Sequence, residues 1–441
     1  MTIRLPEERV YKFLARQVRT KKRGFDFSSI ADPRQQSKVS HRSYSGIIWQ
    51  ALLGLLSNQP TLRDVEEMRL GPWGRRLVPD VVSDTTLDTE LRRMEADALH
   101  AKLVLQIRDL QRGKMLRPST LPFGVATIDG KNLATVNHTA DGSAHKRSKD
   151  NEKWQPKKGR SGTYYLMPAL RATLTSAESK PCIFQKRLPP GTGESSSLDE
   201  MIDELHAAYG RSDMFELIDV DAGLTSLEHA DHVDDLGYAY MMGLKGNQPE
   251  LFAEAQRVLE PMTKICPPEA RTPWERCKGD LLRRSLWRTD QMRGYTNTVG
   301  CWRHLRQTWL VRQETKTSDG QITIEDRYFV SSLLENRVSP QDILTLVRGH
   351  WGIENDSFNS LDVQWREDDG PWCTQGHAVW VLGVLRLMAY NLAQLLRRRH
   401  LRPKTDQGAW RQPVPWRTLF KAIERALARV DLNAVSATTG V

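Results

Sequence analysis

Residues 123–136 read Phe-Gly-Val-Ala-Thr-Ile-Asp-Gly-Lys-Asn-Leu-Ala-Thr-Val, and this stretch decides the fold class. Its apolar and β-branched side chains around Asp129-Gly130 are typical of a β-strand that runs into a hairpin. Upstream, residues 1–118 instead place apolar side chains at helical spacing, most clearly in 47–56. The change of period near residue 119 therefore predicts a helical N-terminal domain followed by a domain rich in β-structure.

The chain after residue 136 alternates strand-like and helix-like segments. We expect strands at 164–175, 181–188, 215–220 and 238–244, and helices at 198–209 and 227–236. Three leading strands followed by alternating helices and strands predict a mixed α/β sheet.

Residues 261–335 interrupt this alternation with arginines, tryptophans and strand-like runs, which predict a β-rich insertion. Ser339, Pro340 and Asp342 then suit the start of a helix over about 340–360. We therefore divide the sheet domain into 119–260 and 336–400, separated by the insertion at 261–335. Residues 401–441 form a C-terminal tail.

The composition limits the classes of partner. A formal net charge of +10 and a pI near 9.3 favour a polyanion such as nucleic acid or an anionic membrane surface. The apolar stretches 47–56 and 378–390 are shorter than the roughly 20 residues that span a bilayer, so we expect no membrane segment. The N-terminus lacks an export signal, and the five cysteines form no C-x-x-C pair. We expect a cytoplasmic protein with reduced thiols.

Two of the predicted strands carry acidic residues whose charge needs compensation in an otherwise apolar segment. Asp129 lies within an apolar strand, where metal coordination would compensate its charge, although an ordinary edge-strand aspartate at a turn is the alternative. In residues 215–223, alternation places Asp219 and Asp221 on one face. Asp221 lies nearer the carboxyl end of its strand, where ligands meet α/β sheets, so it is the better site candidate.

A third acid lies in the helix after the insertion. Residues 348–355 read Arg-Gly-His-Trp-Gly-Ile-Glu-Asn, so His350 and Trp351 share a helix face with Glu354. An exposed glutamate beside a core tryptophan is the alternative interpretation. Phosphodiester cleavage needs carboxylates that converge from rigid elements on divalent ions, and Asp129, Asp221 and Glu354 meet that need.

Three segments together resemble the DDE transposases of bacterial insertion sequences, in particular the ISAs group with its H-repeat-associated members. These are residues 127–131 (Thr-Ile-Asp-Gly-Lys), Asp221-Ala222 with 244–249 (Leu-Lys-Gly-Asn-Gln-Pro), and 350–355 with 361–363 and Glu367-Asp368. The resemblance runs over most of residues 25–400. It implies an RNase H-like mixed-sheet catalytic domain that performs DNA strand cleavage and strand transfer.

The resemblance also implies roles for individual residues. Asp129, Asp221 and Glu354 would hold two Mg²⁺ or Mn²⁺ ions, with Asp129 shared between them. The following residues would support the site or contact DNA: Lys131, Lys245, Asn247, His350, Trp351 and Asn355. Related enzymes often carry a Tyr and an Arg before the Glu and a Lys after it, where this chain has Val347, His350 and Leu361. A hairpin intermediate should therefore not be assumed.

Basic residues outside the triad are candidates for DNA binding. Arg92 and Arg93 lie on a helix expected over 86–94, after an N-cap region at 83–85, that is either a recognition helix or an ordinary packing helix with a basic face. A polar run at 146–160 could neutralise phosphates and stack on a base. Its candidates are Lys146, Arg147, Lys153, Trp154, Lys157 and Lys158.

We expect double-stranded DNA, both transposon ends and target, to be the partner, with a homodimer in the DNA complex and a location at the bacterial nucleoid. Two other functions fit the same residues. One is a catalytically silent DNA-binding protein derived from a transposase, and the other is a metal-dependent nuclease that cuts without joining.

Overall fold

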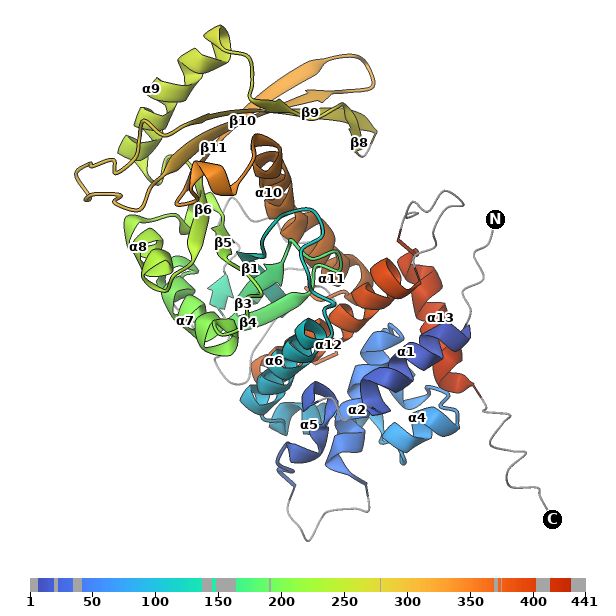
Figure 1. Ribbon diagram of the computed structural model, residues 1–441. Helices are drawn as coiled ribbons and strands as arrows, with labels where there is room; N and C mark the ends of the chain where they lie inside the picture. The colour runs from blue at the N-terminus through green and yellow to red at the C-terminus, as the bar shows by residue number, and fades with distance from the viewer. Residues whose placement is uncertain are drawn as a thin grey trace, which may run out of the picture.

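The computed structural model describes residues 7–19, 23–34, 42–136, 145–147, 164–189, 192–277, 279–368, 372–373, 375–401 and 413–429. Within these ranges the chain folds into three regions that follow one another in space. Figure 1 shows a group of helices at one end, a central sheet with flanking helices, and a long curved sheet with one helix at the other end.

The N-terminal region is helical, as its apolar spacing predicts. Its helices are α1 (Glu7–Arg19), η1 (Arg23–Phe25), η2 (Phe27–Ser29), α2 (Tyr44–Leu56), α3 (Leu62–Glu66), α4 (Pro72–Leu77), α5 (Asp84–Arg93) and α6 (Ala96–Arg112). Helix α2 is apolar on all sides because nearly every residue in it is buried. Helix α5 begins at the predicted cap, where the Ser83 side chain accepts a hydrogen bond from the Thr86 amide.

The central sheet follows the predicted strands closely. Its elements are β1 (Val125–Val136), β2 (His145–Arg147), β3 (Tyr164–Leu174), β4 (Cys182–Arg187), η4 (Ser195–Ser197), α7 (Leu198–Tyr209), β5 (Leu217–Val220), η5 (Ala222–Leu224), α8 (Leu227–Asp235) and β6 (Ala239–Leu244). β1, β3 and β4 pair antiparallel, while β5 and β6 run parallel to β1, in the order β4-β3-β1-β5-β6. This is an RNase H-like mixed α/β sheet, as expected.

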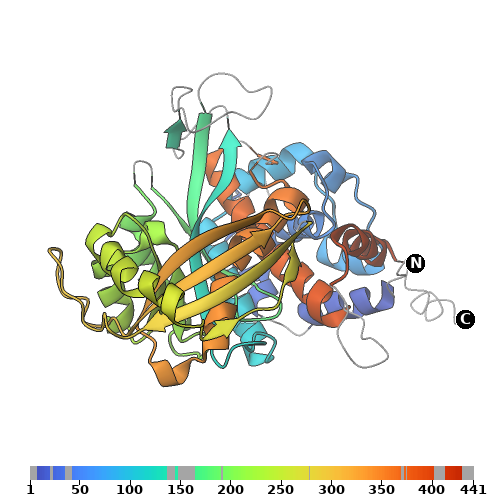
Figure 2. The same cartoon turned by 90° about the horizontal axis from the view of Figure 1, so that it is seen from above.

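The insertion extends the same sheet instead of forming a separate one. Its elements are α9 (Pro249–Ile265), β7 (Ala270–Arg271), β8 (Glu275–Cys277), β9 (Asp280–Thr289), β10 (Gln307–Lys316), β11 (Ile322–Ser331) and η6 (Glu335–Arg337). β11 pairs antiparallel with β6, so all the strands belong to one sheet. Residue 261, where we place the start of the insertion, lies inside α9. Figure 2 shows β9, β10 and β11 spread across the top of the molecule.

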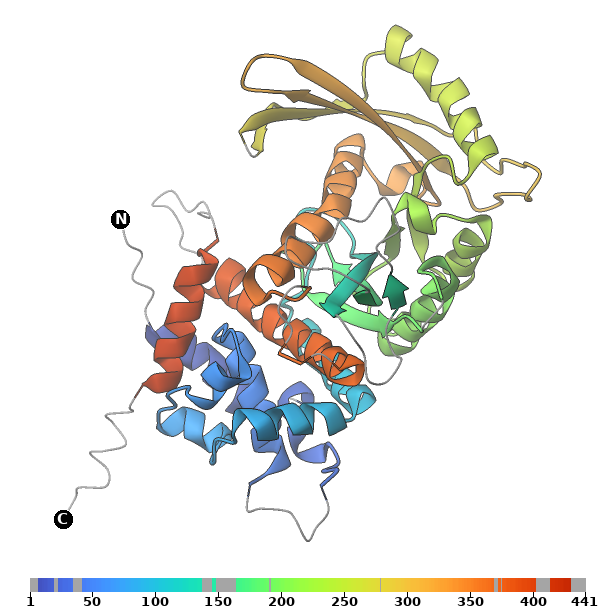
Figure 3. The same ribbon diagram turned by 180° about the vertical axis from the view of Figure 1, so that it is seen from behind.

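The C-terminal helices connect the sheet to the N-terminal region. They are α10 (Pro340–Gly352), a π-helical turn η7 (Ile353–Phe358), α11 (Asn359–Trp365), α12 (Gly376–Leu395), a second π-turn η8 (Leu396–His400) and α13 (Trp416–Ala428). α12 packs against α2, α5 and α6, and α13 packs against α1. Figure 3 shows this run of helices from behind. The predicted tail thus contains a helix that shares the N-terminal core.

Two expectations need correction or refinement. The apolar helix after the site is longer than the stretch 378–390 suggests: residues 376–400 are long and apolar enough to cross a membrane, but every residue of the apolar window is buried in the protein. The hydrophobicity of this helix is therefore explained by its position in the protein core. The helix expected over 340–360 is interrupted by the π-turn η7, which inserts a wider turn at Glu354.

Candidate active site

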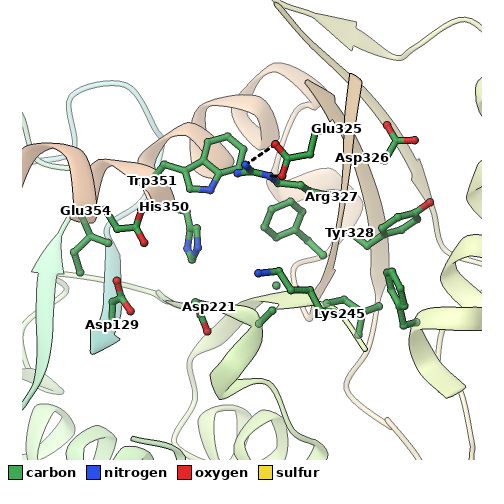
Figure 4. A pocket seen from close by; sticks show the side chains of 16 residues that line it. Asp129, Asp221, Lys245, Glu325, Asp326, Arg327, Tyr328, His350, Trp351 and Glu354 are labelled. Atoms are coloured by element: carbon green, nitrogen blue, oxygen red, sulfur yellow. Dashed lines mark hydrogen bonds and ion pairs between the residues drawn. The ribbon is translucent and has the colours of Figure 1, made fainter. Parts of the chain in front are cut away.

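Asp129, Asp221 and Glu354 line one cavity of about 330 Å³, although they are up to 225 residues apart in the chain. Asp129 extends from β1, Asp221 follows β5 directly, and Glu354 lies in the π-turn after α10. β1 and β5 are neighbouring parallel strands whose register ends at the pair Ile128 and Val220, so the next residues, Asp129 and Asp221, lie side by side. Figure 4 shows the three side chains around this cavity with His350.

The carboxylates that line the cavity lie close enough together to affect one another's ionisation. Burial raises the pKa of Asp129 to about 7, although the Gly130 amide donates a 2.7 Å hydrogen bond to its carboxylate. The negative charges of Asp221 and Glu354 add to burial in raising this pKa to that value. The site therefore concentrates negative charge in a partly dry cavity, which favours a cation there.

Asp219 and Asp221 have different surroundings in the structure, although alternation predicts that both lie on one strand face. The Asp219 carboxylate is buried, accepts a 2.8 Å hydrogen bond from Thr127 and lies 2.9 Å from His350 Nδ1. Burial lowers the pKa of His350, but the Asp219 carboxylate outweighs burial and raises it. Asp219 thus holds His350 in place, while Asp221 faces the cavity and accepts a hydrogen bond from the Gly223 amide.

The other predicted site residues divide into two groups. His350, Trp351 and Lys245 line the cavity. Lys131 does not line it: the Lys131 ammonium is buried in an ion pair with Asp362 of α11. Asn247 donates hydrogen bonds to the carbonyls of Ala222 and Thr225, and so fixes the loop after Asp221.

The motif after Glu354 ties its helix back to the sheet. Glu367 forms a fully buried bidentate ion pair with Arg171 of β3, with both N–O distances at 2.6 Å. Val347 and Leu361, at the places of the Tyr and Lys of related enzymes, are fully buried and belong to the core.

The candidate DNA-binding residues lie outside this cavity or outside the described residues. Arg92 pairs with Asp88, and Arg93 with Glu90, on α5 itself. Lys146 and Arg147 belong to β2, but the structure does not describe their side chains. Lys153, Trp154, Lys157 and Lys158, and the side chain of Asn355, also lie outside the described residues.

Sequence reasoning missed two contributions to the site. The first comes from β11, whose residues 325–329 line the cavity because the insertion continues the main sheet. In the sequence, Glu325, Arg327 and Phe329 alternate and therefore share one strand face, which was the available sign that they could line a site together. The second is Glu194, whose carboxylate lies over Gly130 so closely that a Cβ at Gly130 would overlap it. Burial, followed by the charge of Asp221, raises the pKa of Glu194.

The donor set suits a hard divalent cation, since Asp129, Asp221 and Glu354 offer only carboxylate oxygens. In the part of the chain that the structure describes, no group of three His, Cys, Asp or Glu side chains is placed to hold an ion as it stands. The carboxylates would therefore have to turn toward one another to share a cation. Their residue types and their common cavity fit such a group.

The chain is similar to one known protein family and to a solved transposase structure. Residues 123–392, which include all three acids, match the family model described as "Transposase DDE domain". A piggyBac transposase synaptic complex with hairpin DNA is similar in structure, with a TM-score of 0.40 and 11% sequence identity over 99% of this chain and 80% of that chain. No curated protein matches the chain. Because the family model spans more than half of the sequence, the chain belongs to the family of transposases with a DDE domain.

Proposed function

We propose that the chain is an active DDE transposase that cleaves DNA at the ends of an insertion sequence and joins them to a target. The observation that carries this proposal is the meeting of Asp129, Asp221 and Glu354 at one cavity. We further assign the chain to the ISAs group, because it carries the three motif segments of that group. It would act on double-stranded DNA in the bacterial cytoplasm, at the nucleoid.

Asp129, Asp221 and Glu354 would hold two Mg²⁺ or Mn²⁺ ions, with Asp129 shared and each of the other acids completing one position. Bound there, such ions neutralise charge on the attacking and leaving oxygens of a phosphodiester. The residues of the chain align the scissile phosphate, first against water and then against a 3′-hydroxyl. His350, fixed by Asp219, lies beside the acids, and the Asp219 carboxylate favours its protonated form.

A dimer would be needed in the working complex, because transposition brings two ends together. The measurement is the mass of the complex with end DNA, for which we expect two chains.

The reaction is tested with labelled duplexes from the DNA that flanks this coding sequence, incubated with a plasmid target and Mg²⁺. We expect nicked ends and joined product, and both should disappear in EDTA. Asp129→Asn, Asp221→Asn and Glu354→Gln should each lower the cleavage rate by at least roughly a thousandfold, since each removes a charge that acts in the transition state. Asp203→Asn, on an exposed face of α7, is the matched control and should cleave normally.

Each other outcome supports another function. Nicks without joined product would support a nuclease that cuts only. Binding that persists in Asp129→Asn, with no cleavage by the unaltered chain, would support a silent DNA-binding protein.

A further inference from the structure

Two basic side chains of the cavity lie opposite two of the triad acids, on a side that also holds the carboxylates of Glu325 and Asp326. Asp129 and Glu354 lie toward one end, while Lys245 and Arg327 lie toward the other, as Figure 4 shows. Lys245 follows β6, and Arg327 belongs to the neighbouring strand β11 of the insertion. The cationic side is thus built where the insertion joins the central sheet.

Lys245 is exposed and available to a ligand. It forms no ion pair with any of the described residues. The pKa of the Glu325 carboxyl is lowered mainly by its hydrogen bond with Arg327, and the charge of Lys245 adds a smaller effect. Glu325 instead pairs with Arg327 on its own strand. A solvated ammonium beside a site for phosphodiesters is suited to a backbone phosphate.

Arg327 is held in place by Trp351. Its guanidinium carbon lies 4.1 Å from the centroid of the indole ring, and that of Arg284 from β9 lies 4.9 Å from it. The Trp351 ring therefore already has two cationic partners from the insertion. This arrangement fits a residue that positions Arg327 better than one that stacks on a DNA base.

The Arg327 guanidinium keeps donors for a further partner. Nε and Nη2 each donate to a Glu325 oxygen at 2.8 Å, which leaves three of its five N–H groups. The pair is exposed, with 30% of the Arg327 side chain and 55% of the Glu325 side chain accessible. Such a pair is easily exchanged, and a phosphate offers the planar fork of an arginine two oxygens.

We propose that Lys245 and Arg327 bind backbone phosphates next to the scissile phosphate, and that Trp351 is the positioning residue for Arg327. This inference rests on the proposed function and deepens it. With phosphates held on the cationic side, the adjoining phosphate of the same strand is directed to Asp129, Asp221 and Glu354. The insertion then selects which phosphodiester reaches the carboxylates.

The test measures binding without catalysis. A fluorescein-labelled 30-bp duplex of arbitrary sequence is titrated in EDTA, and Kd is followed by anisotropy between 50 and 200 mM NaCl. Lys245→Gln and Arg327→Gln should each reduce the slope of log Kd against log salt by about 1 and weaken binding about eightfold at 100 mM NaCl. Arg257→Gln is the matched control, because this exposed arginine pairs with Glu254 on α9, outside the cavity lining.

Two further variants separate charge from positioning. Arg327→Lys keeps the charge and should keep the slope. Trp351→Leu should reduce the slope as Arg327→Gln does, whereas Trp351→Phe should restore it by returning an aromatic face. Thermal unfolding of each variant identifies any loss of fold.

An Arg327→Gln or Lys245→Gln slope equal to that of Arg257→Gln would overturn the inference. A Trp351→Leu slope equal to that of the unaltered chain, in a folded variant, would overturn the positioning role. Cleavage is scored separately, so reduced slopes without any cleavage would leave the phosphate contacts standing while the transposase proposal fails. Cleavage with unchanged slopes would support the transposase proposal and overturn the phosphate contacts.

Discussion

Replacement of Asp219 by alanine should destabilise the fold far more than replacement of Asp221, although the two aspartates are only two residues apart. Asp219 is 1% exposed and bonds both His350 and Thr127. A charged hydrogen bond contributes about 1.5–3 kcal/mol and a neutral one about 1 kcal/mol. The sum of about 2.5–4 kcal/mol overlaps the cost of about 3–5 kcal/mol for breaking a buried pair.

Replacement of Asp221 should lower the free energy of unfolding much less. Its carboxylate caps the short helix η5 through the Gly223 amide, a contact worth about 1 kcal/mol. For 441 residues the entropy of unfolding is about 0.9 kcal/mol per kelvin, so a loss of 3 kcal/mol lowers Tm by about 3 °C. Asp221→Ala should lower it by about 1 °C while it abolishes cleavage.

The assay is thermal and urea unfolding in EDTA, which keeps any cation from adding to the stability of the acids. A double-mutant cycle of Asp219→Ala with His350→Ala should give a coupling energy of about 2 kcal/mol. A coupling energy below about 0.5 kcal/mol, or equal Tm losses for Asp219→Ala and Asp221→Ala, would refute the assignment of Asp219 to the support of His350.

Three further predictions concern the scaffold. Glu367→Gln should cost about 3–5 kcal/mol at neutral pH, because it leaves a buried arginine unpaired. Burial raises the pKa of Glu367, but the charge and hydrogen bonds of Arg171 lead the effects that lower it overall. The carboxylate therefore contributes its full stabilisation above the unfolded pKa near 4.5. Urea titrations should show this stabilisation lost as the pH falls through the folded pKa. Gly124→Ala should cost about 1–3 kcal/mol in urea unfolding, because the new Cβ would lie 2.0 Å from the Met214 carbonyl oxygen; Gly130→Ala should cost less, because it meets only the movable Glu194 carboxylate, and equal losses would contradict this. Ser339→Ala should lower stability by about 1 kcal/mol in the same assay, because it removes the capping box of α10, and an unchanged midpoint would exclude that role.

The sequence by itself determined most of the sheet and the order of its elements. The predicted strands and helices between 164 and 244 agree with β3 to β6 within a few residues, because period-2 and period-3.6 patterns are local properties of the chain. Asp129 and Asp221 could be chosen from local patterns too, since Asp129 is a charge within an apolar strand and Asp221 directly follows a strand. The capping residues of α10 likewise marked its start.

Tertiary structure alone decided which side chains meet. Asp219 and Asp221 share a strand face in the sequence pattern, but only the folded chain shows that Asp219 bonds to His350 of α10 while Asp221 lines the cavity. The sequence names Lys131 beside Asp129, but only the fold shows that its ammonium pairs with Asp362, more than 200 residues away. The alternation of Glu325, Arg327 and Phe329 marks a strand face, but the place of Arg327 beside the triad depends on the pairing of β11 with β6. Strand pairing and helix packing join distant segments, and no local period records them.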